Sequence, residues 1–235
     1  MNRTELKFYI KRDDILTIRN IIEKIMKLDS YTNLQKRDYQ VTSLYFDTFD
    51  NKDLDEKLAG ILKRRKIRIR YYGDNSIIKF EVKNRENLII NKESVKISKN
   101  EAAEIIQGNY DILNKFIKDN ECLARTYLDL KTNIYRPRVV VRYDREAYVL
   151  PYGNTRITFD KNLRTSNNKV DLFNSKNLYY PILDDDIHIL EVKYSLFLPQ
   201  PVKYILNSIN TQVSSISKFA LCQKYIEKSP WVDRL

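Results

Sequence analysis

Arginine and lysine alternate with large apolar residues in several segments of this 235-residue chain. In Lys63 to Tyr72, KRRKIRIRYY, Arg68 and Arg70 are one isoleucine apart, and in Ile77 to Lys83 two lysines flank Glu81. Side chains two residues apart on a strand share one face, so each segment predicts a charged row opposite an apolar row. Arginine forks and lysine ammonium groups in such rows are suited to binding the oxygens of phosphate.

Three more segments place charged or hydroxyl side chains two residues apart. They are Glu5 with Lys7, Tyr143 with Arg145, and Glu191 with Lys193. The other face is apolar in each case except the Tyr143 segment, where Asp144 and Glu146 point the other way. An ordinary half-buried sheet with its charges in water explains each strand singly. A sheet closed on itself explains them together: helices would cover the apolar faces, and the charged faces would line a tunnel that needs an anion among its cations.

The composition excludes other kinds of site and favours an anionic partner. Lys and Arg number 42 and Asp and Glu 31, a net charge of +11 that suits nucleic acid, anionic lipid or a phosphate compound. Two cysteines in unrelated contexts exclude a disulfide framework and a four-cysteine zinc site. The single histidine, His188, excludes a multi-histidine metal site. We expect structural roles for His188 and both cysteines.

The N-terminal ten residues have no signal-like apolar core, and no run of about 18 apolar residues occurs. We therefore expect a soluble, cytoplasmic protein that does not span a membrane. Nucleic acid is the competing anion, because Lys63 to Lys66 is a generic basic run. However, the sequence contains no zinc finger, recognition-helix pattern or RNP-type aromatic motif, so we expect no nucleic-acid partner.

Strand patterns and helix patterns alternate in blocks along the chain. Strands are predicted at Glu5 to Ile10, Gln40 to Asp47, Lys63 to Tyr72, Ile77 to Lys83, Leu88 to Ile97, Arg138 to Val149, Arg156 to Asp160 and His188 to Tyr194. Helices are predicted at Lys11 to Leu28, at Asn100 to Leu130 with breaks near Gly108 and Asn120, at Val202 to Ile209 and at Ser217 to Glu227. A turn at Gly73-Asp74-Asn75 predicts a hairpin. This order predicts an α+β fold with a mainly antiparallel sheet.

An ordered set of short motifs resembles the catalytic domain of the vacuolar transporter chaperone (VTC) family, the polyphosphate polymerases of the triphosphate tunnel metalloenzyme, or CYTH-like, superfamily. The motifs in the first half are Arg3-Thr-Glu5-Leu-Lys7-Phe, Ser43-Leu-Tyr45-Phe46-Asp47-Thr, Lys57 with Gly60, Lys66-Ile-Arg68-Ile-Arg70-Tyr71, Lys79-Phe-Glu81-Val-Lys83 and Lys92. Those in the second half are Tyr143-Asp-Arg145-Glu-Ala-Tyr148, Arg156-Ile-Thr-Phe-Asp160, Glu191-Val-Lys193-Tyr194 and Ser217-Lys218-Phe219.

The resemblance implies a single tunnel domain over residues 1–235, a closed antiparallel β-barrel of about eight strands with flanking and capping helices. It implies transfer of the terminal phosphoryl group of ATP onto polyphosphate with Mn²⁺ or Mg²⁺, an ATP:polyphosphate phosphotransferase of the polyphosphate kinase type. Arg3 stands where the superfamily's triphosphatases have the first Glu of a Glu-x-Glu-x-Lys motif, which favours the polymerase branch. No phosphate-sensing or membrane domain accompanies the motifs, so we expect separate proteins, one of them a membrane protein, to regulate the enzyme and translocate its product.

The resemblance also implies roles for individual residues. The phosphate-binding positions are Lys7, Arg68, Arg70, Lys79, Lys92, Tyr143, Arg145, Arg156, Ser217 and Lys218. Catalytic roles fall to Arg68, Arg70, Arg145, Arg156, Glu191 and Lys218, with Glu191 as the metal ligand. Spacing adds Glu81, Lys83 and Lys193 to the tunnel lining. A tunnel triphosphatase, a non-catalytic polyphosphate-binding or nucleotide-binding module and an RNA-binding protein stay open as alternatives.

Overall fold

The computed structural model describes residues 3–32, 35–73, 77–87, 89–118, 120–195, 197–209 and 211–229, without the side chains of Arg3 and Ile89. The chain divides into two compact units. The first unit comprises Met1–Val41, Arg142–Arg164 and Pro181–Ser217, and the second comprises Thr42–Val141, Thr165–Tyr180 and Lys218–Leu235. The single tunnel domain over residues 1–235 stays a prediction.

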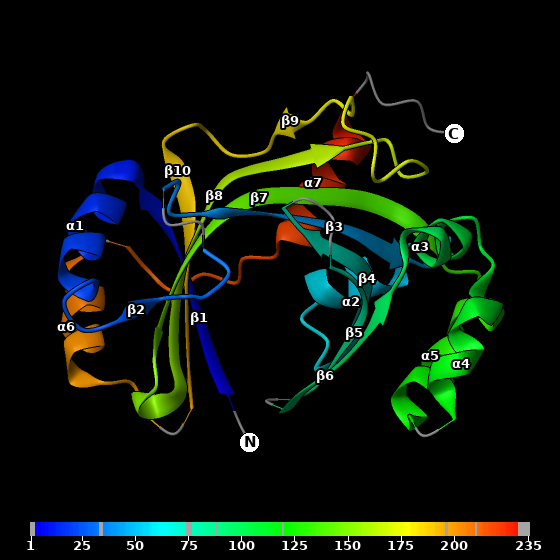
Figure 1. Cartoon of the computed structure of the whole chain (residues 1–235), viewed down its shortest axis with the longest axis horizontal. Helices are drawn as coiled ribbons and strands as arrows, with labels where there is room; N and C mark the ends of the chain where they lie inside the picture. Colours follow the sequence, from blue (N-terminus) through cyan, green and yellow to red (C-terminus); the bar gives the residue numbers. More distant parts are fainter. Residues whose placement is uncertain are drawn as a thin grey trace. The chain divides into compact units, whose positions relative to one another are not determined.

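The described residues form a mostly antiparallel sheet with helices, so the predicted α+β class is confirmed (Figure 1). The strands are β1 (Arg3–Lys11), β2 (Lys27–Leu28), β3 (Tyr39–Asp47), β4 (Lys63–Tyr72), β5 (Ile78–Glu86), β6 (Ile89–Ile97), β7 (Arg136–Leu150), β8 (Thr155–Ser166), β9 (Tyr180–Pro181) and β10 (Ile187–Ser195). The α-helices are α1 (Arg12–Ile22), α2 (Lys52–Leu58), α3 (Lys99–Ile106), α4 (Asn114–Ile117), α5 (Glu121–Thr132), α6 (Gln200–Ser208) and α7 (Lys218–Lys228). Two 3₁₀ turns are η1 (Tyr110–Leu113) and η2 (Tyr152–Asn154).

Hydrogen bonding gives the strand order β1-β10-β8-β7-β3-β4-β5-β6, with β2 paired to β7 and β9 paired to β8. Strands β1 and β6 end this order, and no hydrogen-bonded pairing joins them in the described part of the chain. Closure of the barrel is therefore not confirmed.

In the first unit, the apolar face of β1 packs against two helices. Phe8 and Ile10 of β1 share a buried cluster with Ile15, Ile18 and Ile22 of α1, and α6 contributes to the same cluster (Figure 1). The isoleucines recur at helical spacing, which is why α1 forms here. The helix predicted to reach Leu28 ends earlier, at Ile22, because the next residues turn and the chain then pairs with β7 as β2.

In the second unit, the apolar faces of β4 and β5 pack against α3 and α5. Ile67, Ile69, Phe80 and Val82 are fully buried in this cluster. The breaks predicted near Gly108 and Asn120 are confirmed: Gly108 has a φ of +93° just after α3, and the side chain of Asn120 accepts a hydrogen bond from the amide of Leu123 at the start of α5. The predicted hairpin is formed by β4 and β5, although Asp74 and Asn75 of its turn lie outside the described residues.

Glu146 places a charge on the face of β7 that α1 covers, as the sequence indicated. Its carboxylate is fully buried and accepts two hydrogen bonds of 2.7 Å from Arg19 of α1, one from Nε and one from Nη2. Tyr148 donates a third, of 2.8 Å. Burial acts to raise the pKa of Glu146, but the bonds from Arg19 and Tyr148 outweigh it, so the pKa is lowered. Arg19 thus anchors α1 to β7 through a compensated buried charge.

Replacing Arg19 with Gln is expected to lower the free energy of unfolding by roughly 2 to 3 kcal/mol, because Glu146 stays buried after losing its main partner. Urea unfolding measures the effect. The matched control is Arg37→Gln, which breaks the more exposed pair with Glu23 of the same unit and should cost less than about 1 kcal/mol. Equal costs for the two variants would contradict this role for Arg19.

Candidate functional site

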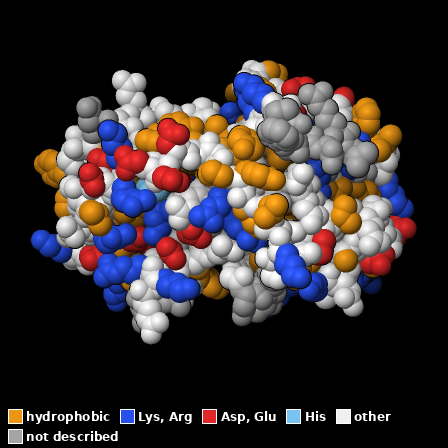
Figure 2. Space-filling model, turned by 90° about the horizontal axis from the view of Figure 1, so that it is seen from above, with side chains coloured by type: hydrophobic (Ala, Val, Ile, Leu, Met, Phe, Trp, Pro, Cys, Tyr) orange, Lys and Arg blue, Asp and Glu red, His pale blue; other side chains and the backbone are white. Residues whose placement is uncertain are grey.

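Exposed charges of both signs mix on the surface, whereas cations gather on one face of β4, β5 and β6. Figure 2 shows a surface on which Lys and Arg side chains lie among Asp and Glu side chains. The second-unit charged face is defined by the register of three strands, on the side opposite their buried apolar residues. Its rows are Lys66, Lys83 and Lys92; Arg68, Glu81 and Ser94; and Arg70, Lys79 and Lys96.

Glu81 lies at the centre of this face, and only 1% of it is exposed. Arg68 approaches the carboxylate to 2.8 Å through Nε and 2.7 Å through Nη2, and Lys92 to 2.5 Å. Burial acts to raise the pKa of Glu81, but the charges of Arg68 and Arg70 and the hydrogen bond from Lys92 outweigh it and lower the pKa to about 2. Glu81 is therefore ionised at neutral pH. The predicted Glu81, Arg68, Arg70 and Lys92 are brought together.

Strand β3 holds both guanidinium groups in place. Nη1 of Arg68 donates a hydrogen bond of 2.9 Å to the Tyr45 hydroxyl, and Nε of Arg70 donates one of 2.9 Å to Ser43. Tyr45 is buried, and the charges of both arginines, followed by that of Lys218, help to lower its pKa against the effect of burial. Lys218, the first residue of α7, therefore lies near this group.

The remaining predicted lysines of this face differ in their surroundings. Lys79 is half-buried and forms no ion pair or hydrogen bond with the described residues. Lys83 is also half-buried and lies in register between Lys66 and Lys92. Cations outnumber carboxylates here, so the face can accept an anion.

The first unit has an equivalent surface, the first-unit charged face. Register places Lys7 opposite Glu191 and Glu191 opposite Thr158, and it places Glu5 opposite Lys193 and Lys193 opposite Arg156. These residues belong to β1, β10 and β8, and alternation puts them on the face opposite the α1 and α6 cluster.

Glu191 is 5% exposed and is surrounded by cations. Lys193 lies 2.9 Å from its carboxylate, Arg145 of β7 3.5 Å and Lys7 3.7 Å. Glu5 contacts the same two lysines at 3.4 Å and 3.5 Å. The predicted Lys7, Arg145, Glu191 and Lys193 are thus brought together, with Glu5 as a second carboxylate.

Both predicted arginines of this unit are held by aspartates. Arg145 is buried and donates two hydrogen bonds of 2.6 Å to Asp160, while its guanidinium lies 5.1 Å from the ring centroid of Tyr143. Arg156 forms an ion pair with Asp29 and donates a 3.2 Å hydrogen bond to the Tyr39 hydroxyl. Sequence reasoning assigned no role to either aspartate. Asp160 could have been found, because it shares the face of Arg156 at period 2, whereas Asp29 lies in a loop without a pattern.

Ser217 is buried just before the first residue of α7, and the segment before it lies along β1. The amide of Ser214 donates to the carbonyl of Lys7 at 2.8 Å, and the Lys7 ammonium donates to the carbonyl of Ile216 at 3.1 Å. Lys7 is thus positioned by both β10 and this segment. The side chain of Arg3, which carries the departure from the triphosphatase motif, lies outside the described part.

The carboxylates on the first-unit charged face are those of Glu191, Glu5 and Asp160, and Asp160 already accepts two hydrogen bonds from Arg145. Within the described ranges, no group of three or more His, Cys, Asp or Glu side chains is arranged to hold a metal ion. A divalent ion of the Mg²⁺ type needs only one or two carboxylates when phosphate oxygens and water complete its shell. Glu191 and Glu5 fit that requirement when a phosphate ligand is present.

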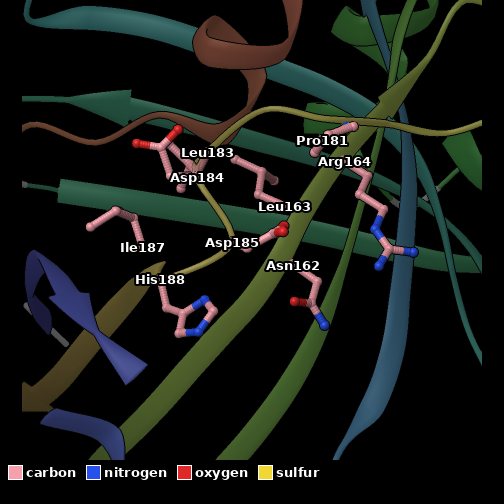
Figure 3. A pocket seen from close by; sticks show the side chains of 9 residues that line it. All are labelled: Asn162, Leu163, Arg164, Pro181, Leu183, Asp184, Asp185, Ile187 and His188. Atoms are coloured by element: carbon pink, nitrogen blue, oxygen red, sulfur yellow. The ribbon is translucent and has the colours of Figure 1, made fainter. Parts of the chain in front are cut away.

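His188 lies on the face of β10 opposite Glu191 and is 4% exposed. It lines a small pocket with Asn162, Arg164 and the Asp184–Asp185 turn (Figure 3). Burial, followed by the charges of Arg12 and Lys161, lowers its pKa. Burial also raises the pKa of Cys122 and raises that of Cys222 to about 12, so neither thiol is activated.

Replacing Glu81 with Gln provides a test of the charge compensation. Because folding lowers the pKa of Glu81, its ionised carboxylate stabilises the fold fully at pH values above 4.5, the ordinary pKa of the group. This stabilisation is lost as the pH falls through about 2. The parent's unfolding free energy minus that of the variant should therefore fall by on the order of 3 kcal/mol between pH 5 and pH 2. Urea unfolding across this range measures it, with the exposed Glu121→Gln as control. A parent-to-variant difference that does not change with pH would contradict the compensation.

The VTC domain model matches residues 2–226, nearly the whole chain. Among solved structures, a proposed adenylyl cyclase from Hippeastrum, HpAC1, described as having a dominant triphosphatase activity, matches with a TM-score of 0.58 and 15% identity over 96% of each chain. A proposed adenylate cyclase from Vibrio parahaemolyticus matches with a TM-score of 0.45 and 15% identity over 88% of this chain and 84% of that one.

Comparison with curated proteins finds no match. In the described part of the chain, no helix is long and apolar enough to cross a membrane. The likeness to the Hippeastrum protein supports the triphosphate tunnel fold. The match to the VTC domain model shows the family. The chain belongs to the VTC domain family.

Proposed function

We propose that this protein is a polyphosphate polymerase that transfers the terminal phosphoryl group of ATP onto a polyphosphate chain. The observation that carries the proposal is the pair of buried glutamates, Glu81 and Glu191, each within reach of three cations on a charged strand face. Such faces are suited to anions, and membership of the VTC family supports polyphosphate and ATP as those anions. The closed tunnel and the cytoplasmic location are parts of the same proposal.

Phosphoryl transfer requires donor and acceptor to be held in line and the charge on the transferred group to be neutralised. Arg68 and Arg70 are suited to the donor triphosphate because β3 already holds their guanidinium groups. Arg145 and Arg156 are held in the same way by Asp160 and Asp29. Groups fixed before the substrate binds need no reorganisation when charge develops.

The remaining assigned residues would bind phosphate oxygens, each in its own unit. Lysines supply compact positive charges, and hydroxyl groups supply hydrogen bonds. They are Lys7, Lys79, Lys92, Lys218, Tyr143 and Ser217. The start of α7 at Lys218 adds the positive end of a helix dipole to this set.

Glu191, with Glu5 beside it, would hold Mn²⁺ or Mg²⁺. When bound, the ion neutralises charge on the phosphoryl oxygens. Lys7, Lys193 and Arg145 contact the Glu191 carboxylate and hold it in position on the charged face. The acceptor needs no strong base, because a terminal phosphate is already ionised, and this agrees with the position of His188 on the opposite face of β10.

Hydrolysis is the second candidate, because the Hippeastrum protein of similar fold is described as having a dominant triphosphatase activity. Incubation of the protein with ATP and Mn²⁺, followed by sizing of the products on a gel, separates the two reactions. Polymerisation yields ADP and a ladder of polyphosphate. Release of orthophosphate without a ladder would establish the hydrolase, and binding without turnover would establish a binding module.

Arg68→Lys and Arg70→Lys keep the charge but remove the planar fork, so turnover should fall about tenfold or more in each variant. Initial rates of ATP-dependent polyphosphate synthesis measure the effect. Arg125→Lys, in an exposed helix pair with Glu121, is the matched control and should keep the parental rate. Full activity of both β4 variants would show that these guanidinium groups do not bind the reacting phosphates.

Glu191→Gln keeps the shape of the side chain and removes its charge. Transfer with Mn²⁺ should be lost, because the metal is held weakly. Binding of polyphosphate without metal should persist or strengthen, because one negative charge is gone from among the cations. Both quantities are measured on the same preparation, with Glu121→Gln as control. If the Glu191 variant turned over like the parent, Glu191 would not be the metal ligand.

A further inference from the structure

A separate group of cations lies in the second unit, where β7 begins. Arg136 and Arg138 are two residues apart on β7, and Lys169 comes from the segment between β8 and β9. All three side chains are half-buried. None of them forms an ion pair with a carboxylate of the described residues. Half-buried arginines elsewhere in the unit, such as Arg65 and Arg68, do form such pairs.

The contacts that these cations make are neutral ones. Arg138 donates a hydrogen bond to the side-chain oxygen of Asn51. Arg136 lies 4.2 Å from the ring centroid of Phe49 and donates a long 3.5 Å hydrogen bond to the Phe49 carbonyl. The Nε atoms of Arg136 and Arg138 are buried without a hydrogen-bond partner, and Lys169 has none among the described residues.

The three charges act on one another. Burial, followed by the charges of Arg138 and Arg136, lowers the pKa of Lys169, and burial followed by Arg136 lowers that of Arg138. The carboxylates whose charges reach Arg138 are Asp47 and Glu227. Asp47 accepts hydrogen bonds from the first turn of α2, and Glu227 accepts them from Asn51 and Gln223. Converging like charges of this kind are costly unless an anion lies among them.

We propose that Arg136, Arg138 and Lys169 form an anion site that takes a phosphate group. Two guanidinium forks and an ammonium group offer the donors that suit a tetrahedral phosphate. The phosphate belongs either to free orthophosphate or to a segment of a polyphosphate chain. None of the three residues has a role in the proposed reaction, so this site stands or falls separately from the polymerase activity.

The test measures the chemical reactivity of the Lys169 amine. The full chain is treated with an amine-reactive reagent, and modification of each lysine is quantified by mass spectrometry with and without orthophosphate or polyphosphate. A bound phosphate should protect Lys169 in a saturable way, while the exposed Lys203 of α6 reacts unchanged. The double variant Arg136→Gln with Arg138→Gln should need roughly tenfold more phosphate for the same protection. Arg125→Gln is the matched control.

Protection by orthophosphate supports a site for a single phosphate group, and protection by polyphosphate alone supports a site for a chain segment. Protection by an RNA oligonucleotide but by neither phosphate compound would overturn the proposal. Absence of any protection of Lys169 in the parent would overturn it too, whether or not the double variant folds.

Discussion

A charged side chain removed from water needs a partner, and this requirement governs both charged strand faces. Glu81 and Glu191 are almost fully buried, and each lies within reach of three cations. Alternation then places the apolar residues of the same strands on the other side, where α1 and α6 cover the first unit and α3 and α5 the second. The helices occupy these faces because the apolar side chains of the strands lie there.

The ion pairs that compensate the glutamates also hold the cations in place for the proposed phosphate ligand. A phosphate group can share the cations with the glutamates, and the arginines are already held by Tyr45, Ser43, Asp160 and Asp29. Arg136, Arg138 and Lys169 differ because their contacts are neutral. The two proposed phosphate sites therefore differ in whether carboxylates hold their cations.

Period-2 alternation was enough to predict β4, β5 and the shared face of Arg68, Arg70 and Glu81, because each side of a strand has one environment. It did not reveal the Arg19 partner of Glu146, since an ion pair between a helix and a strand leaves no periodic trace. The pairing of Arg156 with Asp29 was missed because Asp29 lies in a loop, where no periodic pattern indicates the direction of a side chain. Helix α1 was predicted too long because Ile25 and Met26 continue its pattern after the backbone has turned. Barrel closure depends on pairing between the first and last strands, which alternation cannot specify.

The central claim is that the cations of these faces bind a polyanion, and the salt dependence of polyphosphate binding tests it most directly. Each neutralised phosphate releases a counterion, so the logarithm of the affinity should fall steeply and linearly with the logarithm of the salt concentration. The measurement is a titration of labelled polyphosphate with the full chain at several salt concentrations. A steep slope is the predicted result. An affinity that stays constant across the series would contradict the account.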